Sequence, residues 1–487
     1  MVGVLNPTHS QDGGLHDMST PPTRLEKDSM GAVPVPEAAR YGAQTERARR
    51  NFPISGERFP REFIEALGRV KAAAALVNRE LNVLPAGSAR AIVTAAREVQ
   101  SGALDSDFVL DVFQTGSGTS TNMNANEVIA NRANEIFGKP PGSYAPVHPN
   151  DHVNLCQSSN DVIPTAIHLA ALNTLHGILF PALEALRRSL KKKATEFKGI
   201  VKVGRTHFQD ATPVRLGQEF EGYARMVELG LKRVRRASES LHELALGGTA
   251  VGTGINAHPK FARRAVALLS KETGLALRPA KSRFEAMGGK DAACEVSGAL
   301  RSVAVSLAKI AGDIRFMGCG PRAGIGELKL PAVQPGSSIM PGKVNPVICE
   351  AVLQVAAQVQ GNDLAVAIGA GAGNLELNTM MPLIARNLLE SIRILGNAAS
   401  AFAEKCIDGL EADRERIGRA VELNTALATA LNPWIGYEAA AAIAKEAWAS
   451  GRTVREVALE RTDLGEKKLR VILDSARLTS PGIPGKS

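Results

Sequence analysis

Long apolar stripes with helical spacing run through much of this chain. In one of them, apolar residues follow at steps of three and four: Leu300, Val303, Leu307, Ile310, Ile314 and Met317. This spacing places the side chains along one helix face, where they can pack lengthwise against other helices. Similar stripes cover residues 172–190, with Pro181 as a predicted kink, and residues 348–359. The sequence therefore predicts an all-α protein built around an elongated helical bundle.

The chain is long enough for several structural domains, because 487 residues exceed what one hydrophobic core usually organises. Polar residues interrupt the helical pattern at 154–159 and at 407–411. The predicted parts are a disordered N-terminal extension over residues 1–23, an N-terminal domain over 24–157, a central helical bundle over 158–410 and a small C-terminal helical domain over 411–487. The extension contains neither Arg nor the apolar core of a targeting sequence.

Charge, cysteine content and hydropathy narrow the class of protein. The net charge of +9 is compatible with a polyanionic partner, but the densest basic runs, residues 187–193 and 232–236, alternate with Leu and Val as solvated helix faces do. The five cysteines show no paired spacing, which predicts free thiols in a reducing compartment and no zinc site. No apolar run reaches the roughly 18 residues that cross a bilayer. We therefore expect a cytoplasmic protein with no nucleic acid partner and no membrane partner.

Four segments are rich in small polar residues although most of the chain is helical. The first, residues 114–124, reads Gln-Thr-Gly-Ser-Gly-Thr-Ser-Thr-Asn-Met-Asn. Its hydroxyls and amides suit a carboxylate, and its glycines let the backbone approach a ligand. The same residues would also suit a turn that caps a helix beginning near Asn124. The segment lacks the Gly-Lys-Ser/Thr ending of a phosphate-binding loop.

The second segment, residues 148–161, contains two histidines four positions apart, His148 and His152. That spacing occurs at metal sites on helices, but the Pro-Asn-Asp between the histidines favours a turn. We therefore expect no metal here.

The second segment ends in Ser158, Ser159 and Asn160, which precede a long helix with Pro164 in its first turn. At least one of the three is predicted to cap that helix. A cap and an anion site can coexist, because both use the unpaired N–H groups of a helix start.

The third segment, residues 204–213, contains a single histidine, His207, in a polar stretch between helices. Such a residue is commonly a hydrogen-bonded structural histidine, while imidazole chemistry also suits it to proton transfer. The residues alone leave both readings open.

The fourth segment, residues 335–346, reads Pro-Gly-Ser-Ser-Ile-Met-Pro-Gly-Lys-Val-Asn-Pro. Glycines flank its two serines, as in a mobile loop. Pro346 fits the first position of the following helix, with Asn345 as its predicted cap. Glu350 lies one helical turn beyond Pro346.

Together these segments resemble the fumarase/aspartase superfamily, from about Arg24 to the C-terminal region. The fourth segment is similar to the signature sequence of that superfamily and is very specific. The resemblance implies a three-domain all-α fold whose central bundle tetramerises into a multi-helix core, so we expect a homotetramer. In the superfamily, polar segments from three different subunits meet to form each active site, and neither a cofactor nor a metal is implied.

Within the superfamily, the polar segments are closer to hydratases than to ammonia-lyases. Residues 158–160 (Ser-Ser-Asn), 206–207 (Thr-His) and 341–343 (Pro-Gly-Lys) look like fumarases, whereas aspartases usually have Ser-Thr-Asn, Thr-Gln and Pro-Ala-Lys. The resemblance implies a fumarate hydratase of the tricarboxylic acid cycle, acting on the dicarboxylates fumarate and L-malate through a carbanion intermediate. Aspartate ammonia-lyase is the alternative activity, and a noncatalytic lens-type protein is the alternative class.

The resemblance also implies roles for individual residues. Ser337 would be the proton-abstracting base, and His207, oriented by Glu350, would act on the hydroxyl through a water. The residues that would bind the substrate are Ser117, Thr119, Ser158, Ser159, Asn160, Thr206, Ser338, Lys343 and Asn345. The residues that match a second, noncatalytic anion site of the family are His148, Asn150 and Asp151.

Overall fold

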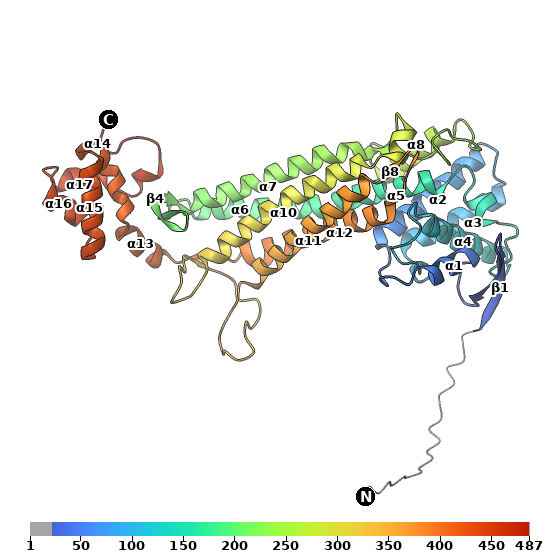
Figure 1. Ribbon diagram of the computed structural model, residues 1–487, viewed down its shortest axis with the longest axis horizontal. Helices are drawn as coiled ribbons and strands as arrows, with labels where there is room; N and C mark the ends of the chain where they lie inside the picture. The colour runs from blue at the N-terminus through green and yellow to red at the C-terminus, as the bar shows by residue number, and fades with distance from the viewer. Residues whose placement is uncertain (1–21, 487) are drawn as a thin grey trace, which may run out of the picture.

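Three groups of helices follow one another along the molecule in the computed structural model, which describes residues 22–486 (Figure 1). Residues 1–21 of the predicted extension lie outside the described residues, and Thr23, which was assigned to that extension, begins a strand instead. The strands of the described chain are short and pair only into two-stranded sheets. The predicted all-α class is therefore confirmed.

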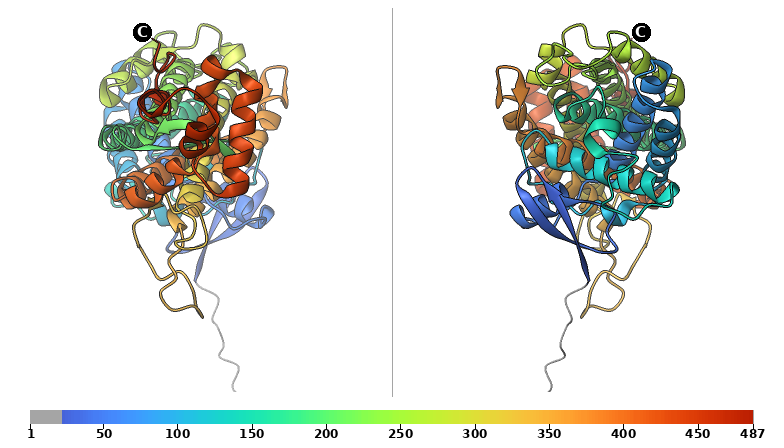
Figure 2. Two further views of the ribbon diagram at one scale, coloured as in Figure 1. Left: turned by 90° about the vertical axis from the view of Figure 1, so that its left-hand side faces the viewer. Right: turned by 90° about the vertical axis from the view of Figure 1, so that its right-hand side faces the viewer.

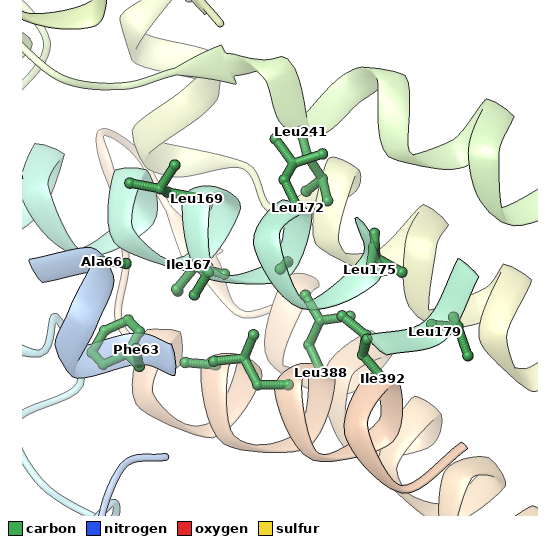
Figure 3. Close-up of a cluster of buried hydrophobic side chains, with 14 of the residues drawn as sticks. Phe63, Ala66, Ile167, Leu169, Leu172, Leu175, Leu179, Leu241, Leu388 and Ile392 are labelled. Carbon is green, nitrogen blue, oxygen red and sulfur yellow. The ribbon is translucent and has the colours of Figure 1, made fainter. Parts of the chain in front are cut away.

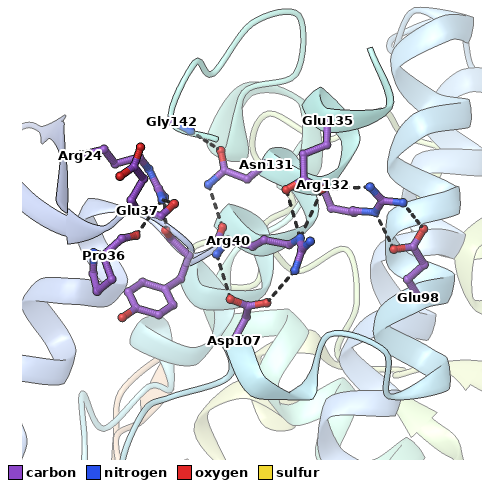
Figure 4. A network of polar contacts seen from close by, with 11 residues as sticks. Arg24, Pro36, Glu37, Arg40, Glu98, Asp107, Asn131, Arg132, Glu135 and Gly142 are labelled. Carbon is purple, nitrogen blue, oxygen red and sulfur yellow. Dashed lines mark hydrogen bonds and ion pairs between the residues drawn. The ribbon is translucent and has the colours of Figure 1, made fainter. Parts of the chain in front are cut away.

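The N-terminal group joins a β-hairpin to a cluster of helices. The two strands of the hairpin pair from Thr23 opposite Pro36 to Asp28 opposite Gly31. After the hairpin, Arg40 links the chain to the helical cluster. Arg40 forms ion pairs with Asp107 (3.6 Å) and Glu135 (3.1 Å), in the network of Figure 4. The elements are β1 (Thr23–Asp28), β2 (Gly31–Pro36), α1 (Ala43–Asn51), α2 (Arg61–Glu80), α3 (Ala86–Ser101) and α4 (Thr119–Ile136).

The central group is a bundle of long helices that run along the long axis of the molecule (Figure 1). Its helices are α5 (Ser159–Thr174), α6 (Phe180–Glu196), α7 (Leu216–Ser238), α10 (Asp291–Met317), α11 (Val347–Ala370) and α12 (Met381–Phe402). The predicted stripe over residues 300–317 lies on α10, and all of its side chains are buried. α10 packs against α7, α11 and α12, so the stripe has the role that its spacing predicts.

A π-helical turn, Leu175–Leu179, connects α5 to α6. It comes directly before Phe180 and Pro181, and a proline has no N–H to donate and excludes a regular carbonyl partner one turn earlier. The irregularity predicted at Pro181 is therefore present as a widened turn. Side chains of this turn still reach the core, beside Leu388 and Ile392 of α12 (Figure 3).

The path of α5 and α6, Ser159–Glu196, is long and apolar enough to cross a membrane by length and composition alone. In its most apolar window, 72% of the residues are buried inside the protein. The apolar character of this stretch is accounted for by the protein core that it forms.

Short elements close the two ends of the bundle. They are β3 (Val201–Thr206), β4 (Gln209–Arg215), β5 (Glu243–Leu244), α8 (Phe261–Thr273), β6 (Arg278–Pro279), α9 (Arg283–Gly288), β7 (Leu328–Lys329), β8 (Gly373–Asn374), β9 (Leu377–Asn378) and β10 (Glu411–Ala412). The segment 318–346, between α10 and α11, stands out from the side of the bundle (Figures 1 and 2).

The C-terminal group packs around a core of its own. Buried apolar residues from Leu427 to Leu473 form one cluster, while another extends from Val33 through both other groups and includes Ile417 at the start of the C-terminal group. The end view in Figure 2 shows the C-terminal helices in front of one end of the bundle. They are α13 (Arg414–Glu422), α14 (Asn432–Ile435), α15 (Tyr437–Ser450), α16 (Val454–Arg461) and α17 (Glu466–Ile472).

The bundle exposes an apolar face. On α11, Val352 and Val366 are buried, but Leu364 is 63% exposed and Ile368 is 61% exposed. Val305 of α10 is 51% exposed. A helix with apolar residues all round is typical of a helix that is buried on every side. Within residues 22–486, Leu364 and Ile368 are therefore not buried as that pattern would predict.

Candidate active site

The starts of two helices meet where the N-terminal group joins the bundle. Ser117 Oγ lies 2.8 Å from Thr119 Oγ1, which lies 2.7 Å from Ser159 Oγ. Because α4 begins at Thr119 and α5 at Ser159, these hydroxyls lie across both helix starts, where free N–H groups favour anions. We call Ser117, Thr119, Ser158, Ser159 and Asn160 the hydroxyl cluster. The structure brings together these residues from the first two polar segments.

The helix of the first segment begins earlier than predicted, at Thr119 rather than near Asn124. Gly118, with φ of +72°, adopts the left-handed conformation that glycine tolerates, so the helix can start directly after it. A Cβ on Gly118 would also come within 2.9 Å of Ile163. Ser117 and Thr119 therefore flank the helix start instead of lying in a loop.

Ser158 caps α5 through a reciprocal pair of hydrogen bonds. Its hydroxyl accepts the N–H of Asn160 (3.2 Å), and its own N–H donates to Asp161 (2.9 Å). The prediction that one of these residues caps the helix is confirmed. The side-chain amide of Asn160 donates to the carbonyl of Ala250 (2.8 Å), which brings a third segment to the cluster.

Asp161 supports the cluster from behind. Its second oxygen accepts the N–H groups of Gly247 (2.8 Å) and Thr249 (3.0 Å). Burial raises the pKa of Asp161 to about 6, although these N–H donors and Lys71 act in the opposite direction. One buried carboxylate thus fixes the start of α5 to the turn around residue 248.

Sequence reasoning missed Asp161 and Lys71 as members of this site. The position of Asp161, three residues after Ser158, is that of the acidic residue in a capping box, which was the available signal. Lys71 is a single charge inside the apolar run 70–77, and its side chain is fully buried. A lone charge in such a run indicates a buried partner network.

His207 lies at the tip of the β3–β4 hairpin, in a stretch whose strands the sequence did not predict. His207 (φ +54°) and Phe208 (φ +60°) both adopt the left-handed conformation, as the two central residues of a tight hairpin turn do. The His207 side chain is exposed, and the ring of Phe208 packs against Phe316 with centroids 4.9 Å apart. Thr206 is the last residue of β3 and is also exposed.

Buried ion pairs anchor the base of this hairpin. Lys202 Nζ lies 2.9 Å from Glu219 and 3.0 Å from Glu327, and Arg205 lies 2.7 Å from Glu327. Lys202 and Glu327 are both buried, so neither charge could remain there without a partner. The hairpin is therefore fixed to α7 and to the segment after α10.

The fourth polar segment forms a loop that closes on itself. Gly336 donates its N–H to the carbonyl of Lys343 (2.8 Å), and a Cβ at Gly336 would come within 2.7 Å of that carbonyl. Ser337 Oγ accepts the N–H groups of Ile339 (3.2 Å) and Met340 (2.9 Å). Ser338 and Lys343 are exposed. Two donors therefore point at the Ser337 oxygen, which favours negative charge on it.

Asn345 does not cap the helix that follows this loop, so that prediction was wrong. Its side-chain amide donates to the carbonyl of Gly336 (2.6 Å), and α11 begins at Val347 without a side-chain cap. The side chain of Asn345 closes the loop instead of capping the helix, because the carbonyl of Gly336 would otherwise have no donor.

The polar segments do not all meet within one chain. Figure 1 shows β4, and so the His207 hairpin, at the opposite end of the bundle from the N-terminal group and the hydroxyl cluster. Glu350 lies in the first turn of α11 and forms no hydrogen bond or ion pair with His207 among the described residues. A dicarboxylate bound at the hydroxyl cluster could not contact His207 of the same chain.

The residues of the predicted second anion site lie on one short turn. A π-helical turn, Pro149–Val153, follows His148, whose Nδ1 accepts the N–H groups of Asn150 (3.2 Å) and Asp151 (3.3 Å). Asn150 and Asp151 are exposed. Over residues 22–486, no group of three His, Cys, Asp or Glu side chains could hold a metal ion.

Comparison with known proteins places this fold and these segments in one family. Residues 31–361 match the family model described as "Lyase", and residues 427–480 match "Fumarase C C-terminus". The chain belongs to the lyase family. Within that family it groups with the class II fumarate hydratases.

Similar proteins of distant organisms are described as fumarate hydratases. The chain is 53% identical to "Fumarate hydratase class II" of Neisseria meningitidis over 438 residues, which cover 90% of this chain and 95% of the relative. It is 54% identical to "Fumarate hydratase class II" of Halobacterium salinarum over 460 residues, covering 94% and 98%. It is 52% identical to "Fumarate hydratase, mitochondrial" of Danio rerio over 447 residues, covering 91% and 88%.

Solved structures agree with the fold. The class II fumarase of Schistosoma mansoni superposes with a TM-score of 0.91 at 38% identity, covering 94% of this chain and 99% of that one. The fumarate lyase:delta crystallin of Brucella melitensis in native form superposes with a TM-score of 0.86 at 46% identity, covering 93% and 100%. The predicted superfamily and enzyme class, a hydro-lyase, are confirmed.

Proposed function

We propose that the chain is a metal-independent fumarate hydratase of the tricarboxylic acid cycle, which interconverts fumarate and L-malate in the cytoplasm as a homotetramer. The observation that carries the proposal is the hydrogen bond between Thr119 and Ser159 across the starts of α4 and α5. It gathers hydroxyls and free N–H groups of two helices around one point, which suits a carboxylate.

What one chain leaves incomplete supports the proposed assembly. The hydroxyl cluster lies at one end of the bundle and the His207 hairpin at the other (Figure 1). Antiparallel association of bundles would bring the end of one chain beside the opposite end of another. The exposed Leu364 and Ile368 of α11 supply an apolar surface for that association. As the resemblance to the superfamily implies, each active site would then draw on three subunits.

Ser337 is the proposed base. In the dehydration direction, its oxygen takes a proton from the malate carbon next to a carboxylate, and the electron pair moves into that carboxylate as a dianionic intermediate. A serine is a poor base unless its alkoxide form is stabilised. The N–H groups of Ile339 and Met340, which already point at Ser337 Oγ, supply part of that stabilisation. The positive charge of Lys343 on the same loop supplies more.

His207 and Glu350 are proposed to act on the hydroxyl group. The carboxylate of Glu350 from another subunit orients the imidazole, which protonates the departing hydroxyl through a water. Departure of the hydroxyl as water returns the electron pair from the intermediate to the carbon–carbon double bond of fumarate. Lys343 and Asn345 hold one substrate carboxylate, together with Ser338, Thr206 and the hydroxyl cluster.

His148, Asn150 and Asp151 are proposed as a separate, noncatalytic anion site. The turn that carries them leads directly into the segment that ends at Ser158. The residues of this turn are therefore close in sequence to the hydroxyl cluster, but none of them belongs to it.

The activity is tested by following the ultraviolet absorbance of fumarate with malate as sole substrate, and then with aspartate. We expect fumarate to form from malate only. Formation from aspartate alone would make the chain an aspartate ammonia-lyase, and formation from neither would favour a noncatalytic protein.

The shared site is tested by mixing two inactive variants, Ser337→Ala and His207→Asn. When both are unfolded together and refolded, random assembly should restore about a quarter of the wild-type sites, because some sites then combine two intact segments. Each variant refolded alone is the control. If co-refolding restores no activity, the two residues do not act from different subunits.

A further inference from the structure

We propose that Lys71 is a positioning residue, which holds the two substrate-binding segments of the hydroxyl cluster in register from behind. Its side chain lies on α2, is fully buried and has no role in the chemistry described above. This inference rests on the proposed function, since it concerns the same site.

The side chain of Lys71 ends in a complete shell of oxygen atoms. Its Nζ donates to Asn122 Oδ1 (2.8 Å), Asn154 Oδ1 (3.0 Å) and Gln157 Oε1 (3.0 Å). An ammonium group has three N–H donors, and here each has its own acceptor. The contacts therefore suit the charged form, although burial lowers the pKa of Lys71 to about 7.

The orientations of these amides are fixed by their other hydrogen bonds. The amide nitrogen of Gln157 donates to the carbonyls of Val153 and Leu155, both at 3.0 Å. Asn122 donates to Asn154 Oδ1 (3.2 Å), and Asn154 donates to the carbonyl of Gln157 (3.2 Å). With every nitrogen bonded elsewhere, the oxygens must face Lys71. The network thus has one arrangement, which is what a positioning device requires.

The three oxygens come from the two segments that the cluster joins. Asn122 lies in the first turn of α4, three residues after Thr119. Gln157 immediately precedes Ser158, and Asn154 lies on the same short connection. Lys71 therefore ties the start of α4 to the approach to α5 on the buried side, while the Thr119–Ser159 bond joins them on the ligand side.

The charge of Lys71 is compensated only at longer range. Among the described residues, no carboxylate lies within ion-pair distance of its Nζ, and Asp161 is the acidic group that acts on it electrostatically. A buried charge is tolerated when every donor is satisfied, so loss of the amide shell or of the ammonium would leave unpaired polar groups in the core. The segments that carry those groups would then shift or loosen.

The test is Lys71→Met, which keeps an unbranched side chain one heavy atom shorter and removes its charge and donors. Because all three hydrogen bonds of the buried Nζ are lost, we expect the two segments to loosen and KM for both fumarate and malate to rise about tenfold, with a smaller change in kcat. Amide hydrogen exchange should become faster in residues 114–124 and 148–160 and stay unchanged in α10. A lysine that contributed only to stability would leave KM as in the wild type and would speed exchange in α10 as much as in the two segments.

Lys193→Met is the matched control. Lys193 is also buried, on α6, where it donates to the carbonyl of Leu410 (2.7 Å) and to Glu196 (2.9 Å). This variant should lose stability without a change in KM. An equal rise of KM in both variants would overturn the proposal, because the effect would then follow from losing any buried lysine.

Asn154→Ala serves if the Lys71 variant does not fold. It removes one of the three oxygens at a partly exposed residue, and we expect the same changes at smaller size. Wild-type KM and wild-type exchange in a folded variant would overturn the proposal. If the wild-type chain does not act on fumarate, the proposed function fails, whereas the exchange measurement still decides the role of Lys71 without substrate.

Discussion

The N–H of Ser158 donates to the carboxylate of Asp161 over 2.9 Å, and the other oxygen of that carboxylate accepts two N–H groups from the turn at Gly247 and Thr249. One side chain thus caps a helix and attaches a distant turn to it. Asp161→Ala would leave these three donors without an acceptor. We expect the free energy of unfolding to fall by about 3 kcal/mol and KM to rise, as measured by urea unfolding and steady-state kinetics.

The same capping arrangement on the surface provides the control. Thr453 and Glu456 form a capping box at the start of α16, where Glu456 is exposed. Glu456→Ala should cost much less stability than Asp161→Ala and leave KM unchanged. Equal losses would show that the burial of Asp161 does not matter.

Ser337→Ala should lower kcat by a factor on the order of a hundred to ten thousand, because the variant lacks the proposed base. KM should change little, since the N–H groups of Ile339 and Met340 remain on the loop. Initial-rate assays over a range of malate concentrations measure both kcat and KM. Ser450→Ala, at an exposed hydroxyl near the end of α15, is the matched control and should behave as wild type. Near-normal turnover of the Ser337 variant would exclude Ser337 as the base.

His168 makes stability depend on pH in the acidic range. It is buried on α5, its Nδ1 donates to the carbonyl of Glu243 (2.9 Å), and burial lowers its pKa from 6.5 to about 4. Between these pH values the unfolded chain binds the proton and the folded chain does not. Stability from this group is therefore fully present above pH 6.5 and is lost, by up to about 3 kcal/mol, as the pH falls to about 4.

His168→Asn keeps a donor near Glu243 but cannot become charged. We expect its free energy of unfolding to vary less between pH 6.5 and pH 4 than that of the wild type, in denaturant titrations at several pH values. Parallel curves for the two proteins would contradict this assignment.

Leu364→Lys should prevent assembly and abolish activity together. The side chain is 63% exposed in the single chain, and a lysine there would place a charge in the proposed apolar contact between subunits. Sedimentation would report the mass and the malate assay the activity. Leu459→Lys, at a position 47% exposed on α16, is the control and should stay assembled and active. An active monomer would contradict the shared site.

Periodicity and local motifs predicted much of the fold. The stripe over residues 300–317 lies on α10, and the predicted cap among residues 158–160 is Ser158, at the start of α5. Both features depend on residues close together in the chain. The hairpin at His207 was not predicted, because its two strands are short and polar and depend on ion pairs made by Lys202 with Glu219 and Glu327.

The site was harder to predict where the partners are distant in sequence. Asn345 was expected to cap a helix, but it bonds to Gly336, and no local pattern separates these outcomes. Lys71 lies 51 positions from Asn122 and 86 from Gln157, so only the fold brings them together. The division into domains and the catalytic roles stay predictions.

The placement of the hydroxyl cluster and the His207 hairpin at opposite ends of the bundle has a genetic consequence. If each chain lends different groups to several sites, one defective copy impairs sites that its intact neighbours also serve. In a cell that makes equal amounts of both forms, a chain altered at Ser337 alone would inactivate only the sites that receive its own Ser337. A chain altered at both Ser337 and His207 would leave about a quarter of the sites intact, half of what the normal chains could supply by themselves.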